Sequence, residues 1–144
     1  MPATLRAHLT ELVTEARGLS DGPAAMDADA VLRRLIDPLP FTALVADNDG
    51  RYVAANRAAS VLTGYGREEL LNLSVWNLTP PTGQRDTDVL WRAFLQQREQ
   101  TGDYVLIKKN GQALKAVYAA RAHFLPGRHL SLIRDETPGA RPPA

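Results

Sequence analysis

The sequence predicts an α+β fold: a five-stranded antiparallel sheet with helices on one face, preceded by an N-terminal helical extension. Two extended segments come first and are joined by the turn residues Asn48-Asp49-Gly50. A block of short helical segments follows. Three further extended segments come last, and Asn110-Gly111, a strong two-residue hairpin signal, joins the first two. Strands and helices that occur in separate runs are typical of this fold class.

The first element is an amphipathic helix over Thr4 to Leu19, because apolar residues recur there at spacings of three and four. A second helical pattern follows Pro23 and stops at Pro38, since a proline disfavours helical angles in the residue before it. We therefore assign residues 1–38 to an N-terminal helical extension that serves as a cap or in dimerisation.

The segment from Phe41 predicts a hairpin and then a capped helix. The runs FTALVA and RYVAA are its two strands. Asn56 stands where a helix N-cap accepts a backbone N–H, and Gly64 stands where the helix end needs left-handed angles. Short helical turns are predicted near residues 68–71 and 75–78.

A longer helix is predicted from Asp86 to about Glu99, with Gly102 just past its end. Three strands follow, over residues 104–109, 112–125 and 129–134. Residues 139–144 have too little apolar content to pack, and we expect a flexible tail or linker.

Composition narrows the class of protein. The chain has 144 residues, which suits one domain, and its formal net charge of +1 provides no field that attracts nucleic acid or an anionic membrane. No stretch approaches the ~18 apolar residues that a membrane helix needs, and the N-terminus has no signal-peptide pattern. We expect a cytoplasmic protein that binds neither nucleic acid nor membrane.

The order and spacing of these pieces resemble a PAS domain over residues 39–138. The similar pieces are ADNDGRYVAAN, which ends in Asn56, then RAASVLTGYGREELL, which contains Gly64, then KKNG and LSLIRDETP. The resemblance implies structural roles for Asn56 and Gly64. It also places Asp135 and Thr137 where such domains pass a signal to an effector.

As a PAS domain, the chain is expected to act in signal transduction, as in two-component systems or transcription regulation. It would bind a small organic ligand or a protein partner, form homodimers and have no catalysis of its own. The effector would be a separate protein or lie beyond Ala144. One alternative is a PAS domain that holds no ligand and only dimerises. Another is a small cone-shaped α+β enzyme, which would need a His–Asp pair or paired carboxylates on inward faces.

The ligand would lie between the long helix and the sheet, by analogy with the family's cavity. The inward face of the long strand carries small residues such as Ala120 and Ala122, which leave volume unless bulky side chains fill it. A fully packed core is the competing interpretation. The candidate ligand-binding residues are Trp91, Phe94, Leu95, Tyr104, Leu106, Leu114, Ala116 and Tyr118.

The sequence excludes some cofactor chemistry. A photoreactive cysteinyl-flavin adduct and a thioester-linked chromophore both need a cysteine, and the chain has none. Haem-binding relatives use a histidine on the long helix, which is absent here. We interpret His8 and His123 as surface residues, assign no role to His129, and expect no metal site. The expected cofactor is none, or an unknown small organic ligand.

The apolar seam of the first helix needs a partner surface. Its burial would be worth several kcal/mol at about 25 cal/mol per Å2. We expect a homodimer in which these helices pack together and contact the outer sheet faces; an intramolecular cap is the alternative. The expected interface residues are Leu5, Leu9, Leu12, Ala16, Leu19, Val117 and Ala119.

Overall fold

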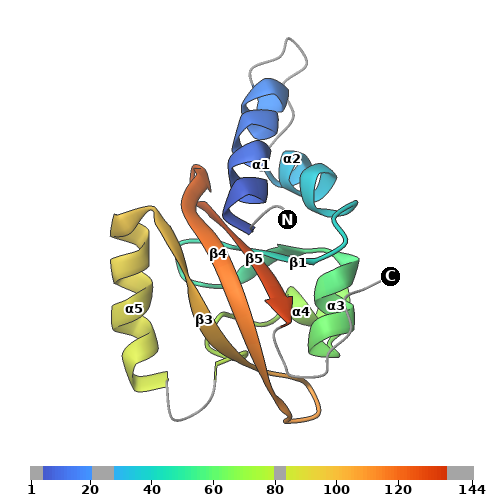
Figure 1. The fold of residues 1–144 in the computed structure, drawn as a ribbon, viewed down its shortest axis with the longest axis vertical. Helices are drawn as coiled ribbons and strands as arrows, with labels where there is room; N and C mark the ends of the chain where they lie inside the picture. The colour runs from blue at the N-terminus through green and yellow to red at the C-terminus, as the bar shows by residue number, and fades with distance from the viewer. Residues whose placement is uncertain (1–4, 21–27, 80–83, 136–144) are drawn as a thin grey trace.

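The computed structural model describes residues 5–20, 28–79 and 84–135, and its centre is a curled antiparallel sheet of five strands. The strands are β1 (Thr42–Ala46), β2 (Tyr52–Ala55), β3 (Glu99–Ile107), β4 (Ala113–Leu125) and β5 (Arg128–Asp135). Their order across the sheet is β2-β1-β5-β4-β3, so the last strand in sequence lies beside the first (Figure 1). The predicted fold class is confirmed.

Helices cover both faces of this sheet. The extension forms α1 (Leu5–Ser20) and α2 (Ala28–Ile36). Between the strands lie α3 (Arg57–Thr63), α4 (Arg67–Leu70) and α5 (Gln84–Gln97). Figure 1 shows α1 and α2 together at one end, with α5 standing on the other side of the long strands. The N-terminal extension therefore closes the sheet face that the central helices leave open.

The apolar seam of α1 is buried within its own chain. Leu9 is 1% exposed, and the same core cluster contains Leu32 of α2, Ala119 of β4 and Leu132 of β5. A bidentate contact adds to this packing, because Arg128 Nε and Nη2 lie 2.6 and 3.4 Å from the two carboxylate oxygens of Asp29 in α2.

This packing agrees with the intramolecular cap, the alternative to an interface between two chains. The apolar residues of α1 pack against α2 and against the outer face of their own sheet, which is apolar enough to bury them. Homodimer formation, and the use of this seam in it, stays a prediction. The residues buried in this way are Leu5, Leu9, Leu12, Ala16 and Ala119, with Val117 partly buried beside them, while the side chain of Leu19 lies outside the described part.

The long helix ends earlier than predicted. Its last residue is Gln97, and Arg98 turns the chain with a φ of 72° before β3 begins at Glu99. Gly102 therefore does not follow the helix end but lies inside β3, opposite Tyr118. A Cβ at Gly102 would lie 3.6 Å from the Tyr118 ring, an ordinary van der Waals distance, so the ring does not require a glycine there.

The motif residues occupy the expected local positions. Gly64 ends α3 with a φ of 81°, and Asp135 is the last residue of β5. Asn56 is fully buried, and its Oδ1 accepts backbone N–H groups from Ala43 and Ala59 at 3.1 and 3.0 Å. Its Nδ2 donates to two backbone carbonyls, so Asn56 joins α2, β1 and α3. Thr137 lies outside the described residues.

Candidate functional site

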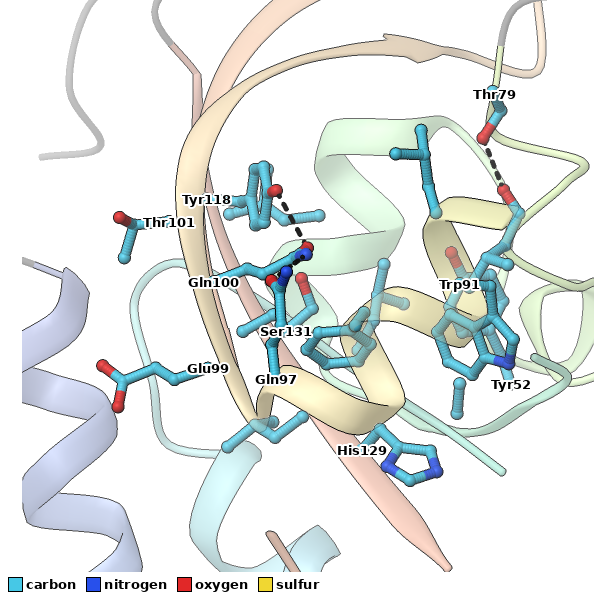
Figure 2. A pocket seen from close by; sticks show the side chains of 18 of the residues that line it. Tyr52, Thr79, Trp91, Gln97, Glu99, Gln100, Thr101, Tyr118, His129 and Ser131 are labelled. Carbon is cyan, nitrogen blue, oxygen red and sulfur yellow. Dashed lines mark hydrogen bonds between the residues drawn. The ribbon is translucent and has the colours of Figure 1, made fainter. Parts of the chain in front are cut away.

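A cavity of about 770 Å3 lies between α5 and the inner face of the sheet. Figure 2 shows side chains from α5, β3, β4 and β5 around it. This volume is within the usual range for small-molecule pockets, roughly 300–1,000 Å3. The residues of the lining used below are Trp91, Phe94, Gln97, Glu99, Gln100, Asp103, Tyr118, Ala120 and His129.

Aromatic side chains of α5 form one wall. Trp91 and Phe94, three residues apart on the helix, face the sheet with ring centroids 5.5 Å apart. Trp91 is fixed at its polar edge, because Nε1 donates to the carbonyl oxygen of Asn48 at 3.0 Å. Phe94 packs against Ala120 and Ala122 of β4. The small β4 side chains leave open the space that larger residues would fill.

A polar cluster stands at the β3 side of the cavity. Gln100 Nε2 donates to Gln97 Oε1 at 2.9 Å, and the Tyr118 hydroxyl donates to Gln100 Oε1 at 3.4 Å (Figure 2). Burial raises the pKa of the Tyr118 hydroxyl, so it stays protonated at neutral pH. The cluster presents neutral donors and acceptors beside the aromatic wall.

His129 of β5 is a buried member of the lining, only 2% exposed. Its Nδ1 accepts the backbone N–H of His123 at 2.8 Å, so Nε2 carries the proton and donates to Asn48 Oδ1 at 2.8 Å. Burial, with a smaller effect from nearby His123, lowers the pKa of His129 to about 4. The ring is therefore uncharged at neutral pH, with both nitrogens occupied.

Some of the predicted ligand-binding residues line the cavity and others do not. Trp91, Phe94 and Tyr118 line the cavity. Leu95 packs beside Phe94 without lining it. The side chain of Tyr104 lies outside the described part. Three other predicted residues do not line the cavity and lie in a core cluster that also includes residues of α3 and α4; these are Leu106, Leu114 and Ala116.

Sequence reasoning missed Gln97, Gln100 and His129. Starting β3 at Tyr104 left Gln100 in a loop, whereas its pairing with Ala120 puts it on the inward face. His129 carried no signal, because histidine is intermediate in its tendency to be buried and residue type alone does not place it in a cavity. The interpretation of His123 as exposed agrees with its position at the β4 bulge.

Two further structural findings concern the described residues only. No group of three or more histidines, cysteines and acidic residues lies close enough there to hold a metal ion. Within the same ranges, no helix is both long and apolar enough to cross a bilayer.

Comparison with known proteins gives one family and many structures. A family profile described as PAS domain matches residues 40–124. A domain of a sensory box sensor histidine kinase/response regulator from Geobacter sulfurreducens is 22% identical, with a TM-score of 0.63 over 74% of this chain and 92% of that one. The PAS domain of a Colwellia psychrerythraea protein is 21% identical, with a TM-score of 0.63 over 77% and 98%.

A third similar structure was solved with a small molecule. It is the PAS domain, in complex with ethanol, of a LuxR-family transcriptional regulator from Burkholderia thailandensis. It is 12% identical, with a TM-score of 0.61 over 78% of this chain and 99% of that one. At these identities the solved structures support the fold alone. No curated protein sequence matches the chain significantly.

Proposed function

Because the chain belongs to the PAS domain family, whose members are sensory domains of signalling proteins, we propose that it senses a small organic ligand bound between α5 and the sheet. The observation that carries the proposal is the aromatic cavity of about 770 Å3 with its cluster of Gln97, Gln100 and Tyr118. A mostly apolar pocket with a few convergent polar groups is the usual form of a small-molecule site.

We propose that the domain performs no chemistry on this ligand. Acid–base catalysis needs a group able to take up and return a proton within reach of the substrate. His129 is held by His123 and Asn48 through both ring nitrogens. Asp47 is engaged by its own turn, where Oδ1 accepts the backbone N–H groups of Asp49 and Arg51 at 2.9 and 3.0 Å. These contacts favour binding over the cone-shaped enzyme.

The alternative of a ligand-free dimerisation module has less support. Its interface would use the α1 seam, and Leu9 of that seam already packs in one chain. For the cofactor, the absence of cysteine from the sequence and of histidine from α5 favours a ligand held without covalent or haem-iron bonds. The purified protein should then be colourless.

A ligand screen with a filled-cavity control tests the proposal. Small aromatic compounds should raise the melting temperature of the wild-type chain and should fail to do so in Ala120→Met, whose longer side chain occupies the cavity. Native mass spectrometry and an absorbance spectrum of the fresh protein would show a retained ligand or a chromophore. A screen in which no compound stabilises the wild type, or in which both proteins respond alike, would reject a ligand-binding cavity.

A further inference from the structure

The lining of the cavity includes two acidic residues, Glu99 and Asp103. Figure 2 shows Glu99 pointing to the side of β3 opposite Gln100 and Tyr118. Its carboxylate oxygens lie 2.8 Å from Arg6 of α1 and 3.9 Å from Arg121 of β4, so its charge is used on the outer face. Asp103 shares the strand alternation of Glu99 and is exposed. Of the described residues in the lining, none is a lysine or an arginine.

The ionisable groups that do face the cavity are uncharged at neutral pH. His129 gives Nδ1 to the His123 backbone and its Nε2 proton to Asn48, so it offers no positive charge to a bound anion. The Tyr118 hydroxyl stays protonated and donates to Gln100. Gln97 is exposed and Gln100 is half-buried, so an ion at this polar cluster would lose part of its hydration without gaining a counter-charge, and that transfer is unfavourable.

The amide pair on the β3 side suits a neutral polar group. Gln97 accepts from Gln100 through Oε1, while its Nε2 has no hydrogen-bond partner among the described residues. An amide or lactam presents one acceptor and one donor at similar spacing, and can exchange hydrogen bonds with both glutamines. The rings of Trp91 and Phe94 are placed to pack against an aromatic portion of the same molecule.

We propose that this cavity selects an uncharged aromatic molecule with an amide- or lactam-like group and rejects aromatic carboxylates and amines. Its ring lies against Trp91 and Phe94, and its polar group meets Gln97 and Gln100. This selectivity rests on the proposed sensory function and narrows the class of ligand.

A matched series of indoles tests the charge selectivity. Indole-3-acetamide, indole-3-acetate and tryptamine share one ring system and differ in charge at neutral pH. Calorimetric titration of the full chain should show the acetamide binding at least about tenfold more tightly than either ion, because only the ions lose hydration without compensation. Equal or tighter binding of the acetate or of tryptamine would overturn the selectivity.

A second experiment locates the polar contact. Gln97→Leu should weaken the binding of indole-3-acetamide by about fivefold, the value of one hydrogen bond. The affinity for the apolar analogue 3-ethylindole should not change. Gln96→Leu is the matched control, because Gln96 lies beside Gln97 on α5, is exposed like Gln97, and does not line the cavity. Equal effects of the two substitutions would contradict the assigned contact.

The two hypotheses fail in different ways. If the ions bind as tightly as the amide, ligand sensing stands and the charge selectivity is wrong. If no member of the series binds the wild-type chain, and Ala120→Met behaves identically, both the selectivity and the proposed cavity function are rejected.

Discussion

The backbone N–H of His123 donates to Nδ1 of His129 at 2.8 Å, across the bulge where β4 loses its register with β5. His123 has a φ of 54° there, a left-handed angle that turns its N–H toward the neighbouring strand. His129 Nε2 then meets Asn48, whose carbonyl oxygen accepts from Trp91. One neutral imidazole thus joins the β4 bulge, the β1–β2 turn and α5.

Acid should destabilise the domain through this histidine. The unfolded His129 binds a proton near pH 6.5, whereas the folded residue does so near a pKa of about 4. Between these values the unfolded state binds more protons, so the free energy of unfolding falls as the pH falls from 6.5 toward 4, by roughly 3 kcal/mol. Above pH 6.5 this contribution should be constant, because both states are neutral.

Urea unfolding at a series of pH values measures this slope. His129→Asn removes the titration while keeping an oxygen that can accept from His123, so its slope should be smaller than that of the wild type. His8→Asn is the control for the loss of a histidine elsewhere, since His8 lies on α1 and does not line the cavity. An unchanged slope in His129→Asn would exclude His129 as its source.

An added leucine should destabilise the chain on one face of β4 and change its stability little on the other. Ala119 is 1% exposed and packs in the core under α1, so Ala119→Leu overfills a packed site and should cost about 1–3 kcal/mol. Ala120 lines the cavity, so Ala120→Leu should change the free energy of unfolding by about 0.5 kcal/mol or less while abolishing ligand stabilisation. Equal destabilisation would show that the cavity is filled.

Local turn and cap chemistry explains why much of the fold was predictable. Gly64 and Asn56 are constrained by the backbone around them, so their roles follow from residue type and spacing. Asn110 likewise behaves as a turn residue, with Oδ1 accepting from the N–H of Gln112 at 2.9 Å. Such signals need only neighbouring residues, which a sequence displays directly.

The cavity was harder to predict because it depends on where α5 ends. Arg98 adopts a left-handed angle although it is not a glycine, so the sequence carries no stop signal there. That one turn decides that Gln100 faces inward and that Gly102 lies in a strand. Likewise, the choice between an intramolecular and an intermolecular host for Leu9 depends on how the outer sheet face is covered, which periodicity along α1 does not reveal.

Asn56→Asp should be severely destabilising although aspartate is a good N-cap. Asn56 Nδ2 donates to the carbonyl oxygens of Ile36 and Phe41 at 3.0 and 2.9 Å, and a carboxylate cannot replace those bonds. Burying the charge adds to the loss, so we expect about 3 kcal/mol or more. Asn77→Asp is the control, because the exposed Asn77 side chain bonds only through its oxygen, toward Ser74, among the residues that the structure describes. Similar costs at both positions would refute the donor role of Asn56.

The α1 seam should stabilise the chain without a partner. Leu9→Ala empties a site that is 1% exposed and should cost about 2–5 kcal/mol. If the seam packs on its own sheet, the melting temperature of the wild type stays constant over about a hundredfold range of protein concentration, whereas a folded state that requires dimerisation becomes more stable as concentration rises. Val61→Ala on α3 is the control, since Val61 is 75% exposed and should change stability by about 0.5 kcal/mol or less. A concentration-dependent melting temperature, together with sedimentation showing that Leu9→Ala converts a dimer to a monomer, would instead establish the seam as an interface between two chains.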